Sequence, residues 1–76
     1  MTKEKSDDSP VLKSLYERLR RATAAEMSAK ERNHAAYYGR IADDLAAAIT
    51  GLAGKTNIYW RMKVVEEFNR ERKKAR

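Results

Sequence analysis

Few side chains in this sequence have the types and spacing that chemistry requires. His34 is the only histidine, and Asp43 and Asp44 are adjacent, so on a helix their carboxylates diverge and cannot clamp a metal ion. The absence of cysteine excludes disulfides, thiolate zinc sites and cysteine nucleophiles. No set of nucleophile, base and orienting group can be assembled. We therefore expect a protein that is not an enzyme, with no catalytic residues, no metal site and no cofactor.

The glycine-containing segment 51–56 is the other place where a charged ligand could bind. A nucleotide-binding phosphate loop needs glycine, four further residues and then Gly-Lys-Ser/Thr, and only Gly54-Lys55-Thr56 fits. The position that requires the first glycine is Ile49, and a helical pattern precedes it where a strand is needed. The single-strand-binding KH domains also join two helices by Gly-x-x-Gly, but they need a sheet, and no segment here alternates like a strand. We expect no small-molecule substrate, while Lys55 remains a candidate phosphate contact.

The positive charge of the chain is concentrated near its C-terminal end. The net charge is +6, and residues 55–76 contribute +5 of it, from eight basic side chains against three acidic ones. Such a segment attracts polyanions, which include nucleic acid and acidic protein surfaces. No stretch approaches the ~18 consecutive apolar residues that cross a bilayer, and residues 1–9 contain no apolar run typical of a signal peptide. A cytoplasmic protein without membrane contact is the expected class.

The apolar periodicity predicts an all-α fold, a three-helix bundle with a helix-turn-helix-like hairpin at its C-terminal end. Ser9-Pro10 begins a helix over about 10–26, because serine caps the N-terminus and proline is tolerated at the first helical position. A second helix over about 29–50 follows a capping-box pattern, Ser28 with Glu31. A kink or a break in it can occur at Gly39, since glycine costs about 1 kcal/mol relative to alanine within a helix. Its apolar seam steps by three and four residues through His34, Tyr38, Ile41, Leu45, Ala48 and Leu52.

The end of the second helix and the start of the third define the domain boundaries. Glycine at 51 or 54 ends the second helix, and Thr56 or Asn57 caps the third. The expected organisation is a disordered N-terminal tail (1–8), a three-helix domain (9–70) and a basic, fraying C-terminal tail (71–76).

The segment 45–62 resembles the helix-turn-helix regulators at the level of the superfamily. That pattern places an apolar residue and alanine in the first helix, then an apolar residue, a turn glycine and two further apolar anchors, here Leu45, Ala46, Ile49, Gly51, Leu52 and Ile58. The turn is longer than the pattern by at least one residue. The resemblance implies that Ile58 anchors the third helix on the second, and that the third helix enters the major groove of duplex DNA.

For a DNA-binding protein, the candidate contacts follow from the order of residues along the third helix. Near its start lie the candidate base-reading residues Asn57, Tyr59 and Lys63. Phosphate contacts would come from Lys55, Arg70, Lys73 and Lys74. The protein would then be a small regulator of transcription or of a plasmid or other mobile element. The adjacent acids Glu66 and Glu67 on this face count against base reading, although pairs such as Lys63 with Glu67 would neutralise part of their charge.

A protein-binding regulator, such as an antiactivator or adaptor, is the alternative from a different class. On a helical wheel the apolar residues of the third helix, among them Ile58, Met62 and Val65, spread over an arc wider than a small bundle needs. That width predicts either a homodimer or a partner with an apolar groove and an acidic rim. The candidate interface residues are Trp60, Arg61, Met62, Phe68 and Tyr37, since Trp, Tyr and Arg dominate such interfaces.

Overall fold

Three helices make up nearly all of the chain that the computed structural model describes, residues 9–74. They are α1 (Pro10–Ser28), α2 (Arg32–Ala53) and α3 (Asn57–Lys74), and no strand occurs among the described residues. The predicted all-α, three-helix fold is confirmed. The N-terminal tail expected over 1–8 lies outside the described residues. In contrast to the expected tail from 71 onward, α3 continues to Lys74, while residues 75–76 are again outside the description.

Two of the predicted helix starts are made by side-chain caps. The Ser9 hydroxyl accepts hydrogen bonds from the backbone N–H groups of Val11 (3.1 Å) and Leu12 (3.4 Å), with Pro10 at the first helical position. The Thr56 hydroxyl accepts one from the N–H of Tyr59 at 3.0 Å. Each cap satisfies backbone donors that have no partner within the helix, and both were expected from the sequence.

The predicted capping box at Ser28 is wrong. Ser28 is the last residue of α1, and its hydroxyl donates back to the carbonyl oxygen of Ala24 at 2.9 Å. The helix that follows has Glu31 at its N-cap position, without a side-chain hydrogen bond to its backbone. The reason is that α1 extends two residues further than its apolar pattern indicates, so Ser28 satisfies the open carbonyls of a helix end instead of the open N–H groups of a helix start.

The second helix also extends beyond its predicted end at 50. It passes through Gly51 and ends at Ala53, where Gly54 caps it with φ +87° and an N–H that donates to the Thr50 carbonyl at 2.9 Å. The turn before α3 therefore consists of residues 54–56. Gly39 does not interrupt α2. A Cβ at that position would lie 3.0 Å from the Glu26 Oε2, so glycine is what lets a carboxylate of α1 lie close to the α2 backbone.

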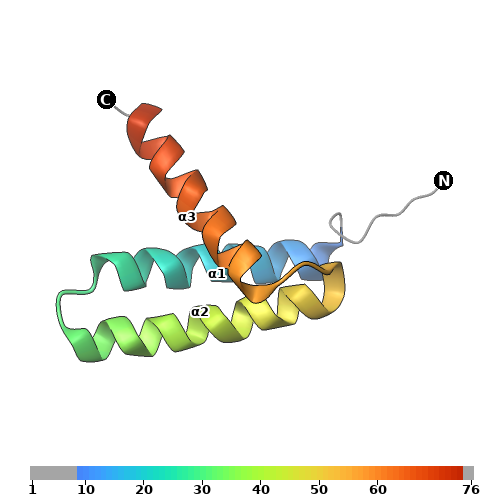
Figure 1. The fold of residues 1–76 in the computed structure, drawn as a ribbon, viewed down its shortest axis with the longest axis horizontal. Helices are drawn as coiled ribbons and strands as arrows, with labels where there is room; N and C mark the ends of the chain where they lie inside the picture. The colour runs from blue at the N-terminus through green and yellow to red at the C-terminus, as the bar shows by residue number, and fades with distance from the viewer. Residues whose placement is uncertain (1–8, 75–76) are drawn as a thin grey trace.

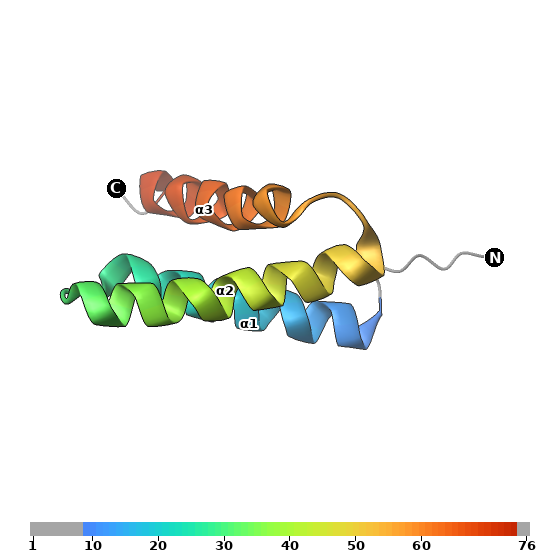
Figure 2. The same cartoon turned by 60° about the horizontal axis from the view of Figure 1, so that its bottom comes forward.

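The helices form two layers, with α1 and α2 as an antiparallel hairpin and α3 crossing over it (Figures 1 and 2). The far half of α3 extends away from the hairpin (Figure 1). The predicted apolar seam of α2 is displaced by one residue, because His34, Ala48 and Leu52 are exposed. The buried positions of this helix are Ala42, Ala46 and Ile49. Alanine lets the helix axes approach closely at the core, which consists of Leu12, Leu19, Ala22, Ala42, Ala46, Ile49 and Val64.

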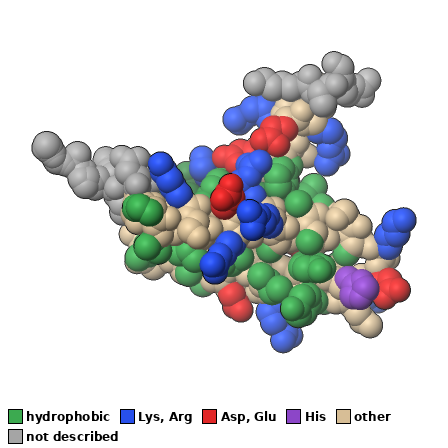
Figure 3. Space-filling model, turned by 180° about the vertical axis from the view of Figure 1, so that it is seen from behind, with side chains coloured by type: hydrophobic (Ala, Val, Ile, Leu, Met, Phe, Trp, Pro, Cys, Tyr) green, Lys and Arg blue, Asp and Glu red, His purple; other side chains and the backbone are tan. Residues whose placement is uncertain are grey.

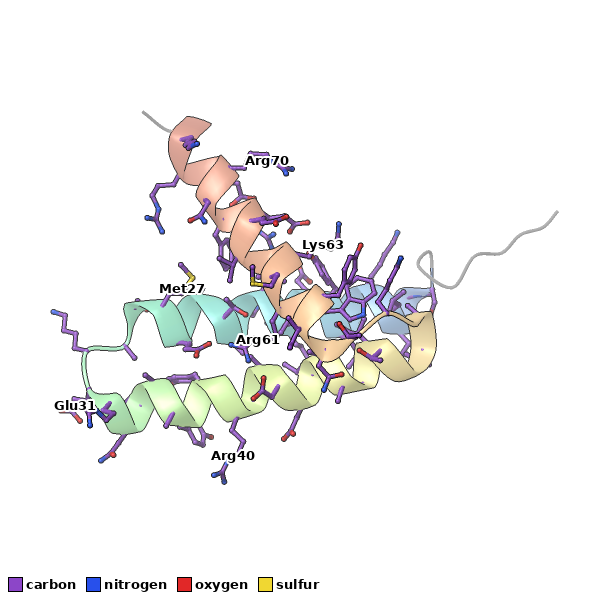
Figure 4. The ribbon with its side chains drawn as sticks, in the orientation of Figure 1. Met27, Glu31, Arg40, Arg61, Lys63 and Arg70 are labelled. Atoms are coloured by element: carbon purple, nitrogen blue, oxygen red, sulfur yellow. The ribbon has the colours of Figure 1, made fainter. Side chains whose placement is uncertain are left out.

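One arginine of α3 ties all three helices together. The Arg61 guanidinium donates to Glu26 of α1 at 2.7 Å and to Asp43 of α2, and it lies 3.5 Å from the Gly39 carbonyl oxygen. Figure 4 shows this side chain directed from the base of α3 toward the hairpin. Arg61 and Glu26 are both mostly shielded from solvent, which strengthens their attraction over that of a surface pair.

A second arginine joins the far part of α3 to α1. Arg20 donates to Glu67 at 2.5 Å and to Glu71 at 3.1 Å, and its guanidinium carbon lies 4.9 Å from the centre of the Phe68 ring. The helix pairs expected between Glu67 and neighbours on its own helix are replaced by this contact with α1. We call the Arg61 and Arg20 clusters the two arginine clamps.

Replacement of Arg61 by alanine tests the first clamp. We expect R61A to lower the free energy of unfolding by about 1–3 kcal/mol, because it leaves the half-buried Glu26 carboxylate without its cation. R70A, at an exposed arginine of the same helix, is the matched control and should change the stability by less than about 0.5 kcal/mol. Urea unfolding followed by circular dichroism gives both values. Equal stability of the two variants would contradict the clamp.

Candidate interaction surface

The face of α3 that packs on the hairpin is narrower than the sequence indicates. Val64 is fully buried, and Trp60 and Phe68 pack beside it on the core. By contrast Ile58 is 73% exposed and Met62 is 53% exposed. The expectation that Ile58 anchors α3 on α2 is therefore wrong. Because α3 crosses the hairpin instead of running along it, only the residues near the crossing become buried.

The helix-turn-helix roles assigned to Gly51 and Leu52 are also not met. Gly51 lies inside α2, not in the turn, and Leu52 is 52% exposed. Ala46 and Ile49 are buried in the positions that the pattern gives them. The resemblance to that superfamily stays a prediction, since part of the pattern coincides with the core and part does not.

Three exposed apolar residues follow one another along the outer side of α3. Ile58 and Met62 are one helical turn apart, and Tyr59, 41% exposed, adjoins them. We call Ile58, Tyr59 and Met62 the α3 stripe. Single exposed apolar residues are common on soluble proteins, and adjoining ones on one helix are candidates for an interaction surface. Tyr59 packs edge-on against Trp60, whereas more than half of the Ile58 and Met62 side chains is open to solvent.

The candidate nucleic-acid contacts do not all lie on one surface. Asn57 and Lys55 are exposed at the start of α3, with the Lys55 ammonium 5.3 Å from the centre of the Tyr59 ring. Lys63 is half-buried beside α1. Arg70 and Lys73 are exposed on the part of α3 that extends beyond the hairpin, and Figure 4 shows Lys63 and Arg70 along the helix. Lys74 is helical, but its side chain is outside the description.

The acidic residues of α3 differ in how far their charge is neutralised. Glu67 and Glu71 are paired with Arg20. Glu66 is exposed and makes no ion pair with another described residue, so its negative charge remains on the outer face of α3, one helical turn from Met62. The clamp therefore removes one of the two adjacent acids that count against DNA reading and leaves the other in place.

The candidate protein-interface residues divide into packed and exposed ones. The Trp60 indole N–H donates to the Gly54 carbonyl at 2.9 Å, and its ring meets Tyr16 edge-on at 6.2 Å. Phe68 lies under Arg20, and Arg61 is engaged within the fold. Of the five residues, Met62 and Tyr37 are the exposed ones, and Tyr37 stands on α2 beside Tyr38.

A groove between α1 and α3 is the feature that sequence reasoning missed. It has a volume of about 450 Å³. Its floor is apolar and its rim is charged, so we define the α1–α3 groove by the floor residues Leu12, Tyr16, Ile49 and Trp60 and the rim residues Lys13, Glu17, Arg20 and Lys63. No single helix carries this pattern, because the groove exists only where α3 crosses α1. The one signal in the sequence was the pairing of lysine with an aromatic residue on each of the two helices.

The Tyr16 hydroxyl in this groove is buried and makes no hydrogen bond with another described residue. Burial raises the pKa of the Tyr16 phenol, and the nearby Glu67 carboxylate raises it further. The neutral phenol is therefore the form that the folded state retains. Its contribution to stability is complete below the ordinary tyrosine pKa and is lost as the pH rises above it.

Other titratable residues offer little chemistry. His34 is exposed, with its Nε2 3.9 Å from the Glu31 carboxylate. Asp43 is engaged by Arg61, and Asp44 is exposed. Among the described residues, no three histidine or acidic side chains gather closely enough to hold a metal ion.

Comparison with protein-family models, with curated proteins and with solved structures finds no match for this chain. In the part of the chain that the structure describes, none of the helices has the length and apolar character to span a bilayer. Figure 3 shows one face of the molecule, on which Lys and Arg side chains gather around carboxylates between areas of hydrophobic side chains.

The buried phenol predicts a specific pH dependence. Between about pH 9 and pH 11 the free energy of unfolding of the wild-type protein should fall more steeply than that of Tyr16→Phe, by at most about 1.4 kcal/mol per pH unit. The reason is that Tyr16 loses its proton in the unfolded state in this range and keeps it in the folded state. Tyr37→Phe, which removes an exposed hydroxyl, is the matched control. Thermal or urea unfolding across this range gives the slopes. Parallel curves for wild type and Tyr16→Phe would show that the phenol is solvated.

Proposed function

We propose that this chain is a small, non-enzymatic protein-binding regulator or adaptor that docks on another protein through the α3 stripe. The single observation that carries the proposal is the exposure of Ile58, Tyr59 and Met62 on a helix whose opposite side is anchored by a fully buried valine. An amphipathic helix presented in this way suits an apolar groove on a partner, where anchors one turn apart enter successive pockets.

The charges on α3 indicate the chemistry of that partner. Arg70 and Lys73 are exposed in the last two turns of α3, and the far half of that helix extends away from the hairpin (Figure 1). Exposed charges of this kind contribute more to the rate of association and to orientation than to affinity. The proposed partner therefore has an apolar groove for the stripe and an acidic surface at one end of it. A homodimer through the same stripe is an outcome that the experiment below distinguishes.

The double substitution Ile58→Asp/Met62→Asp should abolish partner binding and leave the fold intact, because both side chains are exposed. The full chain is used to capture proteins from its host in the presence of nuclease, and the captured protein is purified and titrated against wild type and variant. We expect affinity to fall by about a hundredfold or more, since buried interface anchors are worth ~2 kcal/mol or more each. Val11→Asp, at a comparably exposed apolar residue of α1, is the control and should bind like wild type.

Two results would contradict the proposal. One is a purified partner that binds the double variant as tightly as wild type. The other is a wild-type protein that sediments as a stable dimer while the double variant is monomeric, which assigns the stripe to a second copy of the chain. Circular dichroism of the variant confirms that any loss is not due to unfolding.

Binding of duplex DNA by a small regulator is the second candidate function. The observation that favours it is the exposure of Lys55 and Asn57 at the start of α3 together with Arg70 and Lys73 further along it. Glu66 on the same helix and the half-buried position of Lys63 weigh against base reading.

The test is the anisotropy of a labelled pool of duplex fragments titrated at several salt concentrations. Regulator-like binding requires an affinity for selected fragments well above that for the pool, and a log K that falls by about 0.9 per phosphate neutralised for each log unit of salt. If the chain is a protein-binding regulator, it should bind all duplex fragments only weakly and without sequence preference. Selection of a fragment whose binding is lost in Asn57→Ala would favour DNA instead.

A further inference from the structure

The α1–α3 groove is a second surface, on a different flank of α3 from the stripe. At 100° per residue, Trp60 and Lys63 lie on the side of α3 that faces α1. Ile58 and Met62 lie outside the groove, on the solvent side of the helix. The groove is open along one side and has the volume of a ligand-binding pocket, which is typically about 300–1,000 Å³. A bound group could enter it without movement of the core residues Leu12 and Ile49, which form its base.

The charge of the rim indicates what the groove can hold. Lys13 and Lys63 make no ion pair with another described residue, while Arg20 is occupied by Glu67 and Glu71. Glu17 is the acid on the rim, and the Glu67 carboxylate, which is paired with Arg20, lies near the Tyr16 hydroxyl. The two lysines flank an apolar floor, so the complementary group has an apolar centre with negative charges on both sides of it.

From this arrangement we propose that the α1–α3 groove binds an acidic peptide segment of another protein, with one large apolar side chain of that segment seated on the Tyr16–Trp60 floor. A large aromatic side chain buries about 150–250 Å², which suits one anchor in a groove of this size. The flanking carboxylates of the segment pair with Lys13 and Lys63.

A single-stranded nucleic acid is the other occupant that cations beside aromatic rings suggest, and the geometry favours the peptide. Stacked bases need ring faces that are accessible. Here Trp60 meets both Tyr16 and Tyr59 edge-on, with interplanar angles of 75° and 86°, so the rings pack on one another. Aliphatic Leu12 and Ile49 complete the floor, and Glu17 on the rim repels phosphate. The proposal goes beyond the docking of the α3 stripe and does not depend on it.

Trp60 supplies the readout, because it is the only tryptophan of the chain and lines the groove. The probe is a synthetic peptide of Glu and Asp around one Phe, titrated against the full chain by tryptophan fluorescence. We expect saturable binding that weakens about tenfold in Lys13→Glu/Lys63→Glu, since each reversal replaces an attractive pair by a repulsive one. Glu17→Gln should tighten binding. Replacement of the Phe by Ala should abolish it, and replacement of the acids by Gln should weaken it by less than the lysine reversals do.

Matched controls keep the test decisive. Arg18→Glu/Arg21→Glu makes the same charge change at a second, smaller groove between α1 and α2 and should leave binding unchanged. Ile58→Asp/Met62→Asp should also bind the peptide normally, which separates this inference from the proposed function. If the lysine double reversal unfolds, Lys13→Gln/Lys63→Gln replaces it. The inference is overturned by absence of saturable binding, by equal binding of the lysine variant, or by tighter binding of oligothymidine or of decanoate than of the peptide.

Discussion

Two arginine clamps tie α3 to the hairpin, and the two surfaces proposed for binding follow from the resulting position of the helix. The core contribution of α3 is one fully buried side chain, Val64, with Trp60 and Phe68 beside it. A crossing helix with so small an apolar contact gains little from burial, which scales with the area removed from water. Arg61 and Arg20 add charge-assisted hydrogen bonds to both ends of the contact, and such bonds are stronger than neutral ones.

The clamps also decide which parts of α3 are available to a partner. They engage Arg61 and Glu67 within the fold, and they partly neutralise the exposed Glu71. They orient the helix so that Ile58 and Met62 are on the outside and Lys63 lies over α1. One crossing angle thus produces both the α3 stripe and the α1–α3 groove. The basic side chains of this segment that stay exposed, among them Arg70, Arg72 and Lys73, lie chiefly toward its far end.

Sequence reasoning succeeded where the determining interactions are local. The caps at Ser9 and Thr56 involve neighbours within three residues, and the three helices follow from periodicity, so the fold class could be predicted. The seam of α2 was misplaced because the buried positions Ala42 and Ala46 are weak in a hydropathy pattern although their small size is what close packing requires. The clamps join residues separated by 18 to 51 positions, and no periodicity encodes which of seventeen basic side chains meets which acid. The groove depends on the same crossing, so it was equally hidden.

We propose that the clamps turn the α3 stripe outward to meet another protein. Site-specific photo-cross-linking in the native host tests this role most directly, with a photoreactive amino acid at position 62 and, as a control, at the similarly exposed position 11. Position 62 is expected to give an adduct containing a different polypeptide, and position 11 is not. An adduct at position 62 formed within the chain itself, or with nucleic acid alone, would contradict the proposed role of the stripe.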